Sequence, residues 1–215
     1  MRIERKLTSI LPFLNRRIYI ERGIGYHEMS LHPDIVYDGY WQSYKYFTGS
    51  AERLRKDLVL SDSLLLPADL DGEITENKSV SIHIRRGDYL SFPNRLIYSY
   101  CGPDYYRSAI AYISGKVPDA IFFVFSDDIE WVKRNYTFLP KATKYVIHNE
   151  DPSDCIDISL MRKCRHNIIA NSTFSWWGAF LGEQKNKIVI APRNWYNNKP
   201  DFILRDLIPS EWILI

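Results

Sequence analysis

Cysteine is scarce in this chain of 215 residues: there are three, and no two of them form a CxxC pair. An odd number without metal-type spacing disfavours a disulfide framework, so we expect a reducing, cytoplasmic compartment. No apolar run reaches the ~20 residues that a membrane-spanning helix needs. The first seventeen residues carry Glu4 and no small-residue cleavage site, so we interpret them as mature sequence rather than as a signal peptide.

The chain also lacks an excess of charge of either sign. Lys and Arg number 28 against 26 Asp and Glu, which gives a formal net charge of +2. This balance argues against the broad basic surface of a nucleic-acid-binding protein. A P-loop, a GxGxxG fingerprint, a GxSxG elbow and His/Cys metal spacing are absent from the sequence too. The function classes that those motifs mark are therefore not favoured.

Aromatic residues, by contrast, are plentiful: they make up 14% of the chain, with 6 Trp and 15 Tyr. Such a content suits stacking or sugar-facing surfaces, although an aromatic core is the commoner reason for it. Hydrophobic residues are 46% and charged residues 25%, as in ordinary globular proteins. The length allows one large domain or two small ones.

From residue 79 onward, apolar runs alternate with helical patterns. The run at 120–125 is apolar throughout, which is typical of a strand buried on both faces. The alternation predicts an α/β fold with a parallel sheet, whose ligands bind at the carboxyl ends of the strands. Residues 1–70 are irregular apart from a helix expected at 51–60, and 69–73 is interpreted as a linker or turn. We expect strands at 79–84, 120–125, 144–148, 167–170 and 187–191, and helices at 103–114, around Trp131, at 153–164 and at 171–181.

The first candidate segment leaves the first of these strands and begins at His83. Two adjacent guanidiniums, on Arg85 and Arg86, cannot both be buried without partners. One can pair with Asp88, which leaves the other free for an anion, and arginine grips phosphate in a bidentate manner. A solvated basic turn with a local ion pair is the alternative. The tripeptide from Arg86 to Asp88 would act as an adhesion signal only on an exposed, secreted loop.

The second candidate segment follows the strand expected at 167–170. Free backbone amides at a helix N-terminus, with hydroxyl groups beside them, bind anions without a metal. An ordinary capped helix is the alternative, because Asn, Ser and Thr are the preferred caps. Beside the two arginines at another strand end, this turn would hold the same diphosphate. Its residues are Asn171, Ser172, Thr173, Phe174 and Ser175.

Three sets of carboxylates also need an interpretation. Asp157 lies in an amphipathic helix and could accept hydrogen bonds from a guanine base, although an Asp there is usually just exposed. Asp127 and Asp128 could hold a metal or act as acid and base, but a helix N-cap with a first-turn Asp is favoured. Asp69 and Asp71 fit a D-x-D metal pattern by chance, since no apolar strand precedes them.

The segment HIRRGDY at 83–89 resembles the HxRRxD motif of the α-1,2-fucosyltransferases, glycosyltransferase family 11. Three further segments are similar to family segments and stand in the same order: GYWQSYKYF at 39–47, FFVFSDD at 122–128 and IIANSTFSWWGA at 168–179. The resemblance runs from about residue 35 to about residue 200. Each motif is modest alone, whereas the ordered set is specific.

The resemblance implies a GT-B-type fold with two Rossmann-like halves and the donor GDP-fucose bound by the C-terminal half. It implies inverting transfer of L-fucose to the 2-hydroxyl of a galactose-terminated glycan, without a metal or other cofactor. By this resemblance Arg85 holds the β-phosphate, and His83 and Asp157 meet the guanine. Asp88 aligns the arginines or faces the reaction centre. It is the best candidate in this chain for the general base, and a carboxylate on the missing GGxGNQ-containing half is the alternative. Arg86 is counted with the donor-binding residues, although a structural role is expected for it.

Members of the family open with a GGxGNQ segment, and this chain has no such sequence. We therefore expect residues 1–74 to be the remnant of an acceptor-side half and residues 75–215 to be the donor-binding half. A short chain can bind nucleotide without transferring sugar; that alternative stays open, as does a metal-dependent transferase or hydrolase using Asp127 and Asp128. A glycan on Asn171 would fill the proposed site, which favours a cytosolic, bacterial-type enzyme. Lipid-linked acceptors leave peripheral attachment to the inner membrane open.

Overall fold

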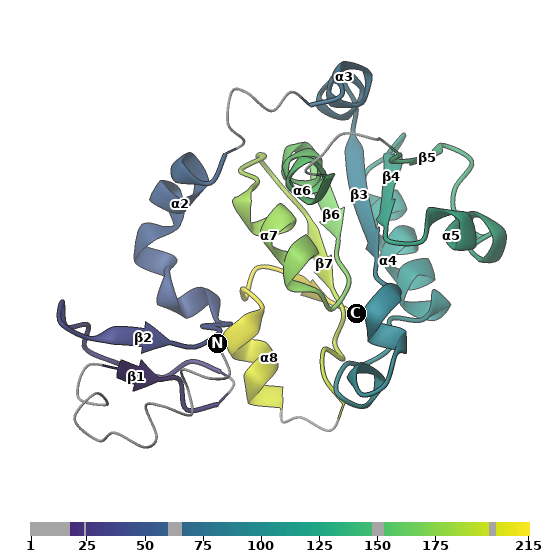
Figure 1. Cartoon of the computed structure of the whole chain (residues 1–215). Helices are drawn as coiled ribbons and strands as arrows, with labels where there is room; N and C mark the ends of the chain where they lie inside the picture. The colour runs from purple at the N-terminus through teal and green to yellow at the C-terminus, as the bar shows by residue number, and fades with distance from the viewer. Residues whose placement is uncertain (1–17, 24, 60–65, 148–152, 198–200) are drawn as a thin grey trace. The chain divides into compact units, whose positions relative to one another are not determined.

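Parallel strands form the sheet that organises most of the chain (Figure 1). The computed structural model describes residues 18–23, 25–59, 66–147, 153–197 and 201–215. Within them, a six-stranded sheet has the order β5-β4-β3-β6-β7-β8, and every neighbouring pair is parallel. The strand order reverses between β3 and β6. The strands are β3 (Ser79–Ile84), β4 (Ile121–Ser126), β5 (Thr143–Tyr145), β6 (His166–Ile168), β7 (Val189–Ala191) and β8 (Ile213–Leu214).

Helices cover both faces of this sheet. Val80, Ile82 and Ile84 of β3 point to one face, where they are buried with apolar side chains of α4 and α5. Phe123 and Phe125 of β4 point to the other face and pack against α3 and α6, and α7 packs against α6. Both faces are therefore buried, as the unbroken apolar run of β4 predicts. The helices are α3 (Ala68–Glu76), α4 (Pro103–Lys116), α5 (Ile129–Asn135), α6 (Ser153–Lys163) and α7 (Thr173–Leu181).

The predicted α/β class and parallel sheet are confirmed, with three local corrections. The segment 69–73 is not a linker but part of helix α3, because Ile74 at its end is fully buried in the core. The helix expected at 103–114 runs two residues further as α4, to Lys116, and ends before Pro118, where proline disfavours further helical backbone. The helix expected at 171–181 begins two residues later, at Thr173, with Ser172 as its N-cap.

The chain divides into two compact units, Met1–Gly49 with Pro200–Pro209 and Ser50–Lys199 with Ser210–Ile215. This division differs from the boundary expected after residue 74, because helices α2 (Ala51–Asp57) and α3 both pack on the larger unit. Arg55 of α2, for example, donates from Nε to the carbonyl of Phe180 at 3.1 Å.

The smaller unit contains two short parallel strands, β1 (Ile18–Ile20) and β2 (Val36–Asp38), and helix α8 (Asp201–Leu207). Aromatic rings contact one another in it, including those of Tyr19 and Trp41, whose centroids are 6.2 Å apart. Asp206 of α8 forms an ion pair with Lys45, and its carbonyl accepts a 2.6 Å hydrogen bond from Ser43.

Candidate functional site

The strand register brings the predicted segments together at one edge of the sheet. Ile84 pairs with Ser126, and Ile82 pairs with Ile168. The residues that follow β3, β4 and β6 therefore leave the sheet side by side, at the reversal of strand order. Open α/β sheets bind ligands at this place, since the loops on either side diverge and leave a crevice.

Arg85, the first residue after β3, is held by two carboxylates. One guanidinium nitrogen lies 2.7 Å from Oδ1 of Asp88, and the other lies 3.4 Å from Oδ2 of Asp127. Its Nε is buried and has no hydrogen-bond partner in the described part of the chain. The side chain is 31% exposed. The guanidinium is thus fixed in place but still has donors available for an anion.

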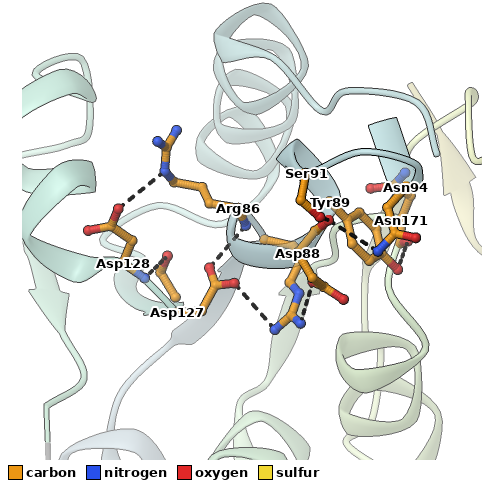
Figure 2. Close-up of polar contacts among 10 residues, drawn as sticks. Arg86, Asp88, Tyr89, Ser91, Asn94, Asp127, Asp128 and Asn171 are labelled. Atoms are coloured by element: carbon orange, nitrogen blue, oxygen red, sulfur yellow. Dashed lines mark hydrogen bonds and ion pairs between the residues drawn. The ribbon is translucent and has the colours of Figure 1, made fainter. Parts of the chain in front are cut away.

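The side chain of Arg86 points toward Asp128 (Figure 2). Its Nε lies 3.5 Å from Oδ2 of Asp128, an ion pair without hydrogen-bond geometry, and its guanidinium carbon lies 3.2 Å from the centroid of the Trp131 ring. The side chain is only 15% exposed. Arg86 is therefore engaged in packing, and the guanidinium of the Arg86–Asp88 tripeptide is not presented as an adhesion signal would require.

Asp127 and Asp128 are both engaged with these arginines. Oδ1 of Asp127 accepts a 3.0 Å hydrogen bond from the backbone N–H of Arg86 (Figure 2). Asp128 is the N-cap of α5 and accepts from the Trp131 N–H at 3.1 Å. A metal at this pair would have to displace Arg85 and an N-cap bond. The described residues contain no group of three or more His, Cys, Asp or Glu that could hold a metal ion.

The D-x-D pattern in α3 has a structural explanation as well. Asp71 lies 2.6 Å from the ammonium group of Lys163 on α6. The pair ties α3 to α6 on one face of the sheet, and no other explanation of the pattern is needed.

A polar cavity of about 490 Å³ lies over the carboxyl ends of β3 and β4 and the start of α7. We call it the main cavity. Its volume falls within the range of pockets that hold drug-sized ligands. It brings together seven of the predicted site residues and excludes Arg86, Asn171 and Ser175. The main cavity is lined by His83, Arg85, Asp88, Tyr89, Tyr98, Ser126, Asp127, Asp154, Asp157, Ser172, Thr173 and Phe174.

His83 reaches the main cavity because of the two-residue period of β3. Its neighbours Ile82 and Ile84 point to the α4 face, so His83 points to the face covered by α6 and α7. The ring lies 5.4 Å from that of Phe174, and Nδ1 is buried without a partner in the described part of the chain. Burial, with the nearby charge of Arg85, lowers the pKa of His83 to about 3. The imidazole is therefore neutral and can donate or accept one hydrogen bond.

Helix α7 points its N-terminus at the same cavity. The N-cap Ser172 is extended, and its side chain makes no capping bond. The backbone amides of the first turn have no acceptor within the helix, so they can bind an anion together with the hydroxyl of Thr173. Ser175 does not take part, because it is buried and its hydroxyl donates to the carbonyl of Ser172 at 3.3 Å.

Asn171 is a structural residue rather than part of the main cavity. Its amide nitrogen donates to the carbonyls of Ser99 and Trp195 at 2.8 and 2.9 Å, and its own carbonyl accepts from the Tyr89 hydroxyl at 3.1 Å. The bonds with Tyr89 and Ser99 join the turn before α7 to the long connection between β3 and α4 (Figure 2 shows Tyr89 and Asn171), and the bond to Trp195 joins it to the segment after β7.

Several lining residues were missed by sequence reasoning, above all Tyr89 and Tyr98. Their rings stack with centroids 4.2 Å apart and an interplanar angle of 12°. Tyr98 lies in the connection before α4 and has no motif around it, so only the folded chain brings it to the site. Asp127 was considered as a metal ligand or cap, whereas its contact with Arg85 needed the strand register.

The fold and the site define a class of protein: a Rossmann-like α/β domain with a polar cavity at the reversal of a parallel sheet, with arginine on one side and a helix N-terminus on the other. A family model described as Glycosyl transferase family 11 matches residues 24–215, and the chain belongs to this family. No helix in the described ranges is both long and apolar enough to cross a membrane.

Relatives with curated names fit this assignment. The chain is 36% identical over 187 residues to an alpha-1,2-colitosyltransferase of Escherichia coli, covering 86% of this chain and 64% of that protein. It is 45% identical over 131 residues to the O-antigen biosynthesis glycosyltransferase WbnK of Escherichia coli, covering 59% and 43%. It is 26% identical over 158 residues to galactoside alpha-(1,2)-fucosyltransferase 1 of Homo sapiens, covering 69% and 43%. The chain thus spans about half of the length of such relatives.

Proposed function

We propose that the chain is the donor-binding part of a galactoside α-1,2-fucosyltransferase that takes L-fucose from GDP-fucose. The observation that carries this proposal is that Arg85 and the N-terminus of α7 line one cavity at the reversal of the sheet. Family membership supports the transfer chemistry, and the relatives include an enzyme named for fucose and one named for colitose. Fucose is our choice of donor sugar because the motif set resembles the fucosyltransferases.

In this proposal different residues bind different parts of the nucleotide. Arg85 and the first-turn amides of α7 hold the diphosphate and stabilise the charge that grows on GDP as it leaves. His83 and Asp157 meet the guanine at the other end of the main cavity. Asp88 orients Arg85 through the 2.7 Å ion pair, and it is also our candidate for the base that takes the acceptor proton. No metal or other cofactor is required.

Calorimetric titration with GDP tests the proposal. Arg85→Ala should weaken GDP binding at least about tenfold, since a hydrogen-bonded charge pair is lost. Arg86→Ala is the matched control: its side chain points to Asp128 and Trp131, so its GDP affinity should stay near that of the wild type. EDTA should not change the wild-type affinity. Equal GDP affinity of the wild type and Arg85→Ala would refute the role of Arg85.

Donor binding without transfer is a second candidate function. It is favoured by one observation, that the chain spans 43% to 64% of the length of the curated relatives named above. Incubation with GDP-fucose and lactose separates the two. Fucosylated lactose above a no-enzyme control would establish transfer. Binding of GDP-fucose without any product would instead support donor binding as the sole function.

A further inference from the structure

A second, smaller cavity adjoins the main cavity. Its volume is about 200 Å³, below the roughly 300 Å³ at which pockets for drug-sized ligands begin, so it suits a single ring rather than a nucleotide. It shares Arg85, Tyr89 and Tyr98 with the main cavity. The smaller cavity is lined by Arg85, Tyr89, Leu90, Arg95, Tyr98, Ser99, Tyr100, Cys101, Asn171 and Asn197.

We propose that the smaller cavity holds the hexose ring of the nucleotide-sugar donor; this inference rests on the proposed function. In a nucleoside diphosphate sugar, the hexose is joined through its anomeric carbon to the β-phosphate. The group that holds the β-phosphate must therefore lie between the nucleotide and the sugar. Arg85 lines both cavities, so a β-phosphate on Arg85 with GDP in the main cavity directs the hexose into the smaller one.

The lining of the smaller cavity fits a 6-deoxyhexose. The rings of Tyr89 and Tyr98 stack on each other, and an outer face of this pair suits the C–H face of a pyranose. The Tyr89 ring is held by its 3.1 Å hydrogen bond to the carbonyl of Asn171. Leu90, which is 44% exposed, offers an apolar contact for the C6 methyl group.

In this inference, Arg95 supplies the hydrogen bonds that recognise the hydroxyl groups of the sugar. Its carbonyl accepts a hydrogen bond from Asn197 at 3.1 Å, which fixes the backbone at the rim of the cavity. The amides of Asn171 and Asn197 are used in bonds to the protein itself. Arg95 is the one charged residue besides Arg85 among the described residues that line the smaller cavity, and the proposal assigns sugar recognition to its guanidinium. It can donate to two neighbouring sugar hydroxyls.

The test compares GDP with GDP-fucose by calorimetry on the same chain. The wild type should bind GDP-fucose about tenfold more tightly than GDP, from the added contacts of the hexose. Arg95→Met should abolish this preference and leave the GDP affinity unchanged. Arg53→Met is the matched control, because Arg53 is 84% exposed on α2, pairs with Asp57 and lines neither cavity. It should keep the full preference.

Three outcomes would overturn the inference. A wild type that binds GDP and GDP-fucose equally has no hexose subsite, and an Arg95→Met variant with the full preference places the hexose elsewhere. An Arg95→Met variant that also loses GDP affinity would assign Arg95 to the nucleotide. A wild type that binds no GDP at all is a distinct result, since it refutes the proposed function and this inference with it.

Discussion

Single residues at the carboxyl edge of the sheet show how burial determines the charge of a side chain. His83 and Arg85 are two residues apart, yet one is 3% exposed and neutral and the other is charged and reaches solvent. Strand β3 ends at Ile84, between these two residues. His83 is therefore buried within the sheet, whereas Arg85 lies beyond its edge. A neutral imidazole and a fixed guanidinium thus line the same cavity, and they offer different chemistry to a ligand.

The buried His83 should make the protein sensitive to acid. Its pKa is lowered to about 3 in the folded chain against 6.5 for an unperturbed histidine, so the unfolded chain binds the proton more tightly. Its contribution to stability is present above pH 6.5 and is lost as pH falls from 6.5 toward 3, by ~1.4 kcal/mol per pH unit. Urea unfolding at pH 7, 6 and 5 should show a smaller loss in His83→Asn than in the wild type. Parallel losses in both proteins would contradict a buried neutral His83.

The approach of Asp127 to Arg85 depends on the lack of a side chain at Gly87. A Cβ atom built at this position lies 2.5 Å from Oδ2 of Asp127, a separation that real contacts do not reach. Gly87→Ala should therefore push Asp127 away from Arg85 and weaken GDP binding by roughly three- to tenfold, without removing any charged group. Calorimetry with GDP measures the change. A Gly87→Ala variant with wild-type GDP affinity would show that the Asp127 contact does not position Arg85.

At the scale of elements, the packing around a helix determines how the replacement of a glycine changes stability. Gly178 lies in α7 where a Cβ atom would meet Cβ of Met161 on α6 at 2.9 Å, so the two helices approach closely because of it. Gly115 lies near the end of α4 with nothing within 4 Å of an added Cβ. The same substitution meets a crowded interface at one site and open space at the other.

Substitution of these two glycines by alanine should change stability in opposite directions. Gly178→Ala should lower the free energy of unfolding by ~1–3 kcal/mol, because it overpacks the contact between α6 and α7. Gly115→Ala should raise it by ~0.5–1 kcal/mol, because alanine loses less backbone entropy in a helix. Urea denaturation of both variants beside the wild type measures the changes. Stabilisation by Gly178→Ala would mean that α6 and α7 do not approach as closely as described.

At the scale of the whole chain, cysteine accessibility reports on the fold. All three cysteines are free: Cys164 is buried, Cys101 is partly buried and Cys155 is exposed. Burial raises the pKa of Cys101 to about 11 and that of Cys164 to about 12, so both stay as unreactive thiols near neutral pH. Exposure alone therefore singles out Cys155 for reaction with a soluble thiol reagent.

The native chain should accordingly react rapidly with 5,5′-dithiobis(2-nitrobenzoate) at one thiol, and at all three after unfolding in guanidinium chloride. Cys155→Ser should remove the rapid phase, whereas Cys164→Ser should leave it intact. The absorbance of the released thiolate gives the number of reacting groups. Rapid reaction of two or three thiols in the native chain would show that the core around Cys164 or Cys101 is open.

Much of the fold could be predicted from the sequence by itself. The strands expected at 120–125 and 79–84 lie close to their predicted bounds. The first is an unbroken apolar run, which is typical of a strand buried on both faces, and the second carries β-branched residues at alternate positions. Helix α3 could not be predicted, since its charged first turn resembles a loop and only the burial of Ile74 against the core makes it a helix. The motif order also indicated the family, which the comparison confirms.

Only the tertiary structure determined which residues line the main cavity. The residue types alone do not separate Arg85 from Arg86, or Asn171 from Ser172, and it was only the family resemblance that predicted different roles for the two arginines. The end of β3 and the register with β4 turn Arg85 toward the main cavity and Arg86 toward Trp131. Sequence pattern reports which side chains alternate along one element, but the direction of a side chain beyond the end of a strand depends on contacts from other elements. Tyr98 shows the same limit, because its partner Tyr89 is defined only by the folded connection between β3 and α4.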